Sequence, residues 1–142
     1  MNPIEDLLAA LVAHLRAQPV VSSIVGARVF GMELPEAEAR HMPRHALVLQ
    51  PSGGAVPGYA QSLALDSARI DIYSYGPTPF EAMRLRRATR AAMREVTRVR
   101  VGTTLLHWAL PAGGYAQERD AKTRWPLVWE SFTVLASERA AA

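Results

Sequence analysis

Few side chains in this sequence have the types and spacing that metal binding requires. His41 and His45 are four residues apart, the spacing with which two histidines on one helical face can bind a metal. Pro43 lies between them in a segment with the composition of a loop, so we interpret the pair as loop surface. His14, near the polar side of an N-terminal helix, and His107, within a strand, have no visible partner. We therefore predict no metal site.

The acidic and hydroxyl side chains form no recognisable catalytic group. Asp66 and Asp71 are the only acids in a long segment of alternating apolar residues, and no general acid or base accompanies them. Ser22 and Ser23 lack the context of a nucleophile elbow. The two glycine-rich turns lack the lysine and the serine or threonine of a phosphate-binding loop. The sequence predicts no catalytic residues, no cofactor and no enzyme activity.

One stretch does carry a strong chemical signal. RLRRATRAAMR, residues 84–94, contains five arginines and no acidic residue. Residues 80–100 hold seven arginines and two glutamates, a balance of +5, so the overall net charge of +3 leaves 3 − 5 = −2 for the rest of the chain. The positive charge is therefore local, and five of the seven arginines belong to one expected helix.

On a helix, where successive residues are about 100° apart, this stretch divides into two faces. Leu85, Ala88 and Ala92 form a narrow apolar face that can pack closely against a sheet. We expect the opposite side to carry the candidate interaction residues, which are Phe80, Met83, Arg86, Arg87, Arg90 and Arg94.

The residue types alone leave three interpretations of this arginine side open. Arginine is a good helix former whose stem covers apolar surface, which fits a solvated helix face. Methionine, phenylalanine and arginine are also enriched at protein interfaces, and arginines three or four residues apart repel one another when no acid relieves them. The charge suits nucleic acid as well, but no helix-turn-helix, zinc finger or stacking platform accompanies it.

Length and composition indicate a soluble globular protein, and we predict a single domain over residues 1–142. The chain is 49% hydrophobic and 20% charged, and no apolar run approaches the roughly 18 residues that span a bilayer. Glu5 and Asp6 stand where a signal peptide has positive charge, so we expect the N-terminal stretch to be mature structure. The absence of cysteine excludes disulfides and fits folding in a cytosol.

The spacing of apolar and turn residues predicts α+β architecture. We expect an N-terminal helix, capped by Asn2, that ends before Pro19. A central helix over about residues 78–96 begins with Thr78 as cap, Pro79 in its first position and Glu81 completing a capping box. Both helices are expected to pack against an antiparallel or mixed sheet.

The remaining segments are expected as strands and connections. Trp125 and Trp129 share one side of the last strand, either in the core or as a partly exposed assembly edge. We predict a turn with a short extended piece at 28–30, then a loop at 32–45, a strand at 46–50 and a glycine-rich turn at 51–58. One long strand, or two, follow at 61–74, with a bulge near 66–68. After the central helix we expect a strand at 99–110, a turn at PAGGY, a polar loop at 117–124 and a last strand at 126–136.

The order of these features resembles the tail terminator, or tail completion, proteins of long-tailed phages and prophages, including the minor tail protein U type. The resemblance covers nearly the whole chain and rests on the order of segments, with the junction at Ile70–Met83 and the stretch Arg119–Val134 the most telling. The segments are VGARVF, the proline-bearing loop into ALVLQPSGG, ARIDIYSYGPTPFEAMRLRRATRAAM and ERDAKTRWPLVWESFTVLA.

The resemblance implies a structural protein of the virion with no cofactor. Such proteins form a six-membered ring on the head-proximal end of the finished tail tube, end tube polymerisation and present a surface for head joining. The implied partners are further copies of the chain, the major tail tube protein and a head-completion or neck protein, after assembly in the host cytoplasm. DNA would pass through the ring without sequence-specific binding, and no membrane is involved.

A ring with DNA in its lumen favours the interface interpretation of the arginine side, because a basic lumen would hold DNA back. Glutamate in place of Arg87 or Arg90 is then expected to weaken assembly more than folding. The loops at 31–45 and 51–61 are candidates for contacts above and below the ring. Two alternatives remain: a neck protein on the head side, and a small basic DNA-binding protein.

Overall fold

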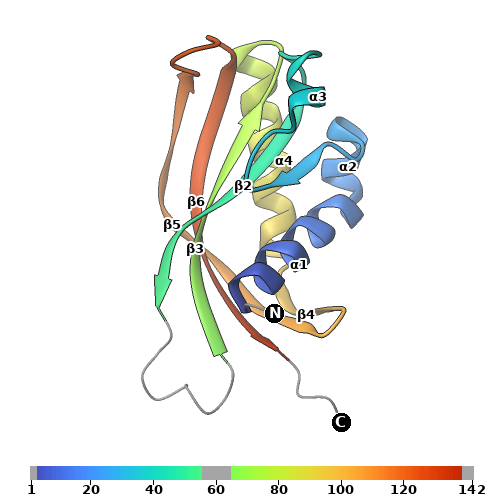
Figure 1. Ribbon diagram of the computed structural model, residues 1–142, viewed down its shortest axis with the longest axis vertical. Helices are drawn as coiled ribbons and strands as arrows, with labels where there is room; N and C mark the ends of the chain where they lie inside the picture. Colours follow the sequence, from blue (N-terminus) through green and yellow to red (C-terminus); the bar gives the residue numbers. More distant parts are fainter. Residues whose placement is uncertain (1–2, 56–64, 139–142) are drawn as a thin grey trace.

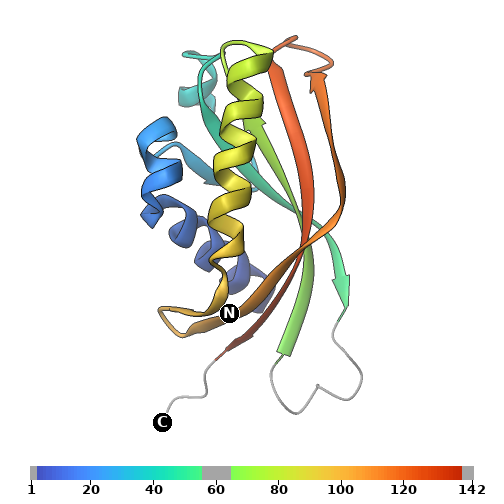
Figure 2. The same cartoon turned by 180° about the vertical axis from the view of Figure 1, so that it is seen from behind.

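The computed structural model describes residues 3–55 and 65–138 of the chain (Figure 1). In chain order the elements are α1 (Pro3–Ala17), α2 (Pro19–Val25), β1 (Val29–Gly31), α3 (Glu36–Ala39), β2 (Ala46–Ala55), β3 (Leu65–Tyr75), α4 (Pro79–Arg94), β4 (Thr97–Val101), β5 (Thr104–Arg119) and β6 (Pro126–Glu138). The strands form one curved sheet in the order β1-β2-β3-β6-β5-β4, with α1, α2 and α4 on one face (Figures 1 and 2).

The expected α+β class is confirmed, with a mixed sheet packed against the N-terminal and central helices. β1 pairs parallel with β2, while each other neighbouring pair of strands in the described residues is antiparallel. Strand β3 alternates as the sequence pattern requires, with Ala68, Ile70 and Ile72 buried beneath the helices. On β6, Phe132 and Val134 extend the same buried face.

The N-terminal helix ends at Ala17 as expected, while its expected cap Asn2 lies outside the described residues. The expected turn after it is wrong, because residues Pro19–Val25 form a second helix. Proline suits the first helical position, and Val21 and Val25, one turn apart, are fully buried. Burial of this pair therefore outweighs the modest helix propensity of β-branched residues.

These two helices bear on the question of membrane segments. No single helix in the described residues is long and apolar enough to cross a bilayer, and α1 and α2 meet the criteria of length and composition only as a pair bent by 82°. The apolar residues Leu7, Leu11 and Leu15 of α1 are fully buried in the protein core.

Two strands run further than the sequence pattern indicated. β2 continues from the expected ALVLQ through the glycine-rich stretch to Ala55, and residues 56–64 lie outside the described part. The expected bulge near 66–68 is wrong, because the register shift lies on β2 between Pro51 and Gly53 and β3 is regular. The expected strand at 99–110 is two strands, β4 and β5, joined by a tight turn at Gly102.

The expected chain reversal at PAGGY is also wrong. β5 continues through these residues to Arg119, with an irregular register against β6 between Pro111 and Tyr115. The polar reversal follows at 120–125, and the last strand then begins at Pro126 as expected. A bulge that preserves the pairing on both sides looks like a turn in the sequence, because both use glycine.

Asp66 of β3 provides a test of how burial affects stability. It is buried on the helix-facing side, and burial raises the pKa of its carboxyl above the ordinary value, partly offset by the Ser67 backbone. Because the folded-state pKa lies above the unfolded one, the ionised group destabilises the fold, and this cost disappears as pH falls through the folded pKa. We expect Asp66→Asn to raise the thermal midpoint at neutral pH, by a margin that shrinks at mildly acidic pH. Equal midpoints for both proteins at neutral pH would contradict this.

Candidate interaction surface

The start of α4 is fixed by its expected cap. The backbone N–H of Glu81 donates to Thr78 Oγ1 at 3.2 Å, and Pro79 occupies the first turn. The expected capping box is only half formed in the described contacts. The Glu81 carboxylate lies 3.0 Å from His45 Nε2 and 3.2 Å from Arg84 Nη1, so it ties the helix to the segment before β2.

The buried face of α4 is wider than the predicted stripe. Leu85, Ala88 and Ala92 are buried as expected. The face also includes three further buried side chains, which are Ala82, Thr89 and Met93. On the helical wheel Met93 is at about 180° and Arg86 at about 200°, so Arg86 borders the buried face.

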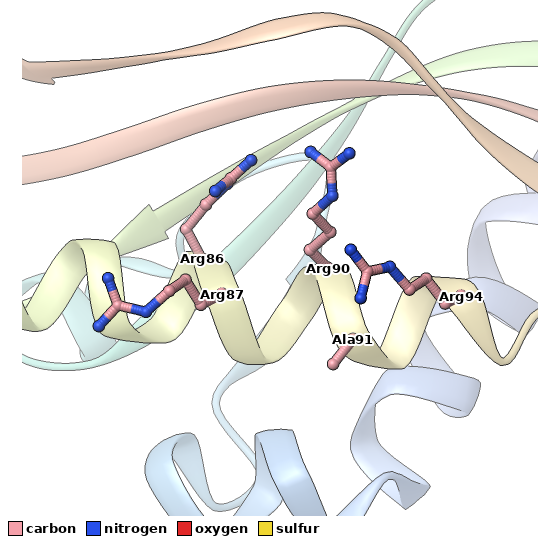
Figure 3. Close-up of a pocket in the computed structure, with 5 residues that line it drawn as sticks. All are labelled: Arg86, Arg87, Arg90, Ala91 and Arg94. Carbon is pink, nitrogen blue, oxygen red and sulfur yellow. The ribbon is translucent and has the colours of Figure 1, made fainter.

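The expectation that Arg86 faces away from the fold is wrong. Arg86 Nε and Nη2 donate to the two carboxylate oxygens of Glu130 at 2.9 and 3.2 Å, and Arg90 Nη1 donates to the same carboxylate at 2.8 Å. Figure 3 shows both side chains turned toward the sheet, whereas Arg87 and Arg94 lie along the helix. Arg90 is therefore a fold contact as well as a surface residue, so glutamate there is expected to affect folding too.

Glu130 explains how so many arginines are tolerated on one helix. It lies on β6 with a side chain only 3% exposed, and the Arg86 side chain is only 11% exposed. The Arg86 guanidinium also stacks 3.9 Å from the ring centroid of Tyr115 on β5. A fork-shaped donor set on a buried carboxylate, covered by an aromatic ring, is the geometry in which a buried ion pair is satisfied.

The sequence reasoning missed Glu130 and Tyr115, although a signal for Glu130 was present. Val128 and Phe132, which lie two residues before and after Glu130 on β6, are apolar and buried. The period of two therefore places the Glu130 side chain beneath the helices. Tyr115 follows the irregular register of β5, and such a shift cannot be located from the alternation alone.

The other interaction candidates line an open groove between α4 and β5. We define the α4–β5 groove by Arg87, Arg90 and Arg94 on α4 and by Leu110, Pro111 and Gln117 on β5. It comprises three adjoining hollows. The middle one, lined by Arg86, Arg87, Arg90, Ala91 and Arg94, has a volume of about 330 Å³ (Figure 3). It shares Arg87 with one neighbouring hollow, and Arg90 and Arg94 with the other.

Exposed apolar side chains and uncompensated charges accompany this groove. Phe80 is 88% exposed beside the half-buried Met83, and Leu110 is 55% exposed. In the described part of the chain, Arg87 and Arg94 have no salt-bridge partner. Exposed aromatic and aliphatic groups beside arginine have the composition of a protein interface.

The groove also ends at a free strand edge. β4 pairs with β5 only between Thr104 and Trp108, so within the described residues the stretch Pro111–Arg119 has no strand on its outer side. Its inner side pairs with β6 at Pro111 and again from Tyr115 to Arg119. Its outer backbone groups are therefore available to another extended segment.

The histidines lie in structural contacts. His14 is buried, not on a polar side as expected, and its Nε2 lies 3.1 Å from the carbonyl oxygen of Ala92. His107 Nε2 lies 2.8 Å from Ser137 Oγ. His45 contacts Glu81 while His41 is exposed, and no group of three metal-ligating side chains gathers within the ranges described.

The aromatic residues near the last strand divide between two faces of the sheet. Phe132 is in the core, while Trp129 is half-buried on the face without helices, beside Tyr73 of β3. Trp125 packs edge-on against Tyr75 at 6.3 Å between ring centroids, and burial raises the pKa of Tyr75 to about 12. The two tryptophans are therefore not part of the core beneath the helices.

Comparison with known proteins identifies the family. The sequence matches the family model "Tail completion protein gp17" over residues 9–134. The chain belongs to this family. Family membership gives the tail completion protein a structural role in tail assembly and confirms the resemblance seen in the sequence.

One solved structure shows the same fold as this tail completion protein. A chain of "Virion of native gene transfer agent (GTA) particle" matches with a TM-score of 0.62 and 16% identity, covering 92% of this chain and 94% of that chain. No curated protein matches the sequence.

Proposed function

We propose that this tail completion protein forms a homohexameric ring that ends polymerisation of the tail tube. The observation that carries the proposal is the family match over residues 9–134. A ring at the head-proximal end of the tube would also provide the surface to which the head or neck attaches. The fold shared with a chain of a gene transfer agent virion is compatible with this role in a particle.

A closed ring needs two different and complementary surfaces on every subunit. The α4–β5 groove is one suitable surface, because it combines exposed apolar groups with arginines and a strand edge that have no partner within the described residues. In this proposal the interface residues are Phe80, Met83, Arg87, Arg90 and Arg94. Arg86 contributes indirectly, because it binds Glu130, the carboxylate that also binds Arg90. The contacts of Arg86 and Arg90 with Glu130 leave less positive charge to hold DNA, which would pass through the lumen.

The neighbours in the virion would be the major tail tube protein below the ring and a head-completion or neck protein above it. The proposed contact segments with these neighbours are the part of the 31–45 segment that follows α3, and residues 51–61 as far as they are described. Assembly would take place in the host cytoplasm before heads and tails join.

Deletion of the gene in the parent phage tests the proposal. We expect tail tubes of uncontrolled length that do not join to heads, and purified protein that forms six-membered rings in negative-stain images. Tails of normal length from the deletion, together with protein that stays monomeric at high concentration, would refute it. Immunolabelling of isolated heads but not tails would instead favour a neck protein on the head side.

Arg87→Glu provides a residue-level test of the interface. We expect the subunit dissociation constant to rise at least tenfold, because the exposed charge changes sign within the groove, while thermal stability stays within about 0.5 kcal/mol of wild type. Sedimentation velocity measures the first quantity and thermal unfolding the second. Lys122→Glu, the same change of charge in the exposed 120–125 reversal, is the control and should leave assembly unchanged. Equal effects of the two substitutions would contradict the interface assignment.

A further inference from the structure

An acidic segment lies at the opposite edge of the sheet from the α4–β5 groove. Residues 32–39 contain three glutamates and no basic residue. They directly follow β1, which is the first strand of the sheet, whereas β5 and β4 are the last. Figure 1 shows α3, which begins at Glu36, on the far side of the sheet from β5.

The charges of this segment are partly held within the chain and partly free. Glu38 receives two hydrogen bonds from Arg44, at 2.6 and 2.9 Å, and these bonds hold the pKa of its carboxyl below the ordinary value. Glu33 and Glu36 are exposed and have no salt-bridge partner in the portion of the chain that is described. The Arg44 contact therefore anchors the segment while two carboxylates remain available, which reduces the ordering cost of binding.

The groove has the opposite charge. Arg86 and Arg90 share one carboxylate, leaving an excess of one positive charge, and Arg87 and Arg94 add two more. Beside them lie Phe80 and Leu110, while the acidic segment carries Met32, which is 49% exposed. Both surfaces thus combine charge of one sign with exposed apolar side chains.

From these observations we infer that the acidic segment Met32–Ala39 of one subunit docks in the α4–β5 groove of the next. The inference rests on the proposed ring and names its head-to-tail contact. Glu33 and Glu36 would pair with Arg87 and Arg94, and Met32 would contact the apolar wall of the groove. Because the two surfaces lie at opposite edges of one sheet, each subunit can use both at once, as ring closure requires.

Charge reversal of each surface tests the contact. The groove-reversed protein carries Arg87→Glu and Arg94→Glu, and the segment-reversed protein carries Glu33→Arg and Glu36→Arg. Each alone would bring like charges together, so we expect at least tenfold weaker assembly of each, with wild-type thermal stability. In a one-to-one mixture each reversed surface meets its complement, and rings containing equal numbers of the two proteins should form. Native mass spectrometry distinguishes the two proteins by mass.

Two results would overturn the inference while leaving the ring proposal intact: rings formed by either reversed protein alone, or no recovery in the mixture of folded proteins. Wild-type protein that forms no ring in solution or on tails would instead contradict the proposed function, and the docking contact with it.

The absence of cysteine allows an independent test of direction. Ala37→Cys and Ala91→Cys place thiols in the segment and in the groove without changing their charges. With a short bismaleimide the double variant should give a ladder of cross-linked subunits, because each subunit has one of each thiol. Cross-linked dimers from either single variant would show a like-to-like contact and overturn the head-to-tail arrangement.

Discussion

Replacing Arg86 with alanine is expected to lower the free energy of unfolding by about 3 kcal/mol, or roughly 10 °C in thermal midpoint. The substitution removes the two-point contact with Glu130, whose side chain is 3% exposed, and leaves Arg90 as its cationic contact among the residues that the structure describes. It also removes the guanidinium stacked on Tyr115. A buried carboxylate that loses most of its hydrogen bonds keeps its desolvation cost, which is why the loss exceeds that of a surface ion pair.

Matched variants separate this mechanism from a general effect of losing arginine. Arg87→Ala, one residue along the helix and exposed, should change stability by no more than about 0.5 kcal/mol. Arg86→Lys keeps the charge but cannot form the fork, so it should retain only part of the stability. The pair Arg86→Met with Glu130→Leu should be more stable than Arg86→Ala, because no buried charge is left unpaired. Chemical denaturation in which Arg86→Ala and Arg87→Ala behave alike would refute the role of Glu130.

Local sequence signals were sufficient to predict the elements that begin or end at a capping residue or a proline. The central helix was predicted from Thr78 and Pro79 and lies within two residues of its expected bounds at Pro79–Arg94. The last strand begins at Pro126 as expected. In both cases residues close in the sequence determine where the element begins, and tertiary contacts determine only which of its faces is buried.

The sequence analysis missed elements whose conformation depends on contacts with residues far away in the sequence. α2 forms because Val21 and Val25 are buried against other helices, which the propensity of its valines does not indicate. β5 passes through PAGGY because β6 pairs with it on both sides of the irregularity. Glycine in a strand and glycine in a turn look alike until the partner strand is known.

The candidate site shows the same division between local and long-range information. The helical wheel correctly placed Leu85 and Ala88 in the core and Arg87 on the surface. It misplaced Arg86, because the position of that side chain depends on Glu130, forty-four residues away in the sequence. A helical wheel describes one helix alone, so it contains no information about a carboxylate on a neighbouring strand such as Glu130.

Gly76→Ala is expected to destabilise the protein by about 3 kcal/mol or more, and to do so through the position of α4. Gly76 is buried between β3 and the cap of α4. A Cβ atom at Gly76 would lie 2.5 Å from the backbone nitrogen of Ala82 and 2.8 Å from the carbonyl carbon of Glu81. These are backbone atoms of the first helical turn, so the contact cannot be relieved by rotating a side chain.

The first turn of α4 must therefore move, and its contacts move with it. The Thr78 cap and the contact of Glu81 with His45 both lie within this turn, so a shift weakens them together. Because the helix also carries Phe80 and Arg87, Gly76→Ala should impair assembly as well as folding. Gly114→Ala is the matched control, since a Cβ there meets no atom within 4 Å and its backbone needs no positive φ. If thermal unfolding places the two variants at the same midpoint, close packing at Gly76 does not position the helix, and the groove is held by other contacts.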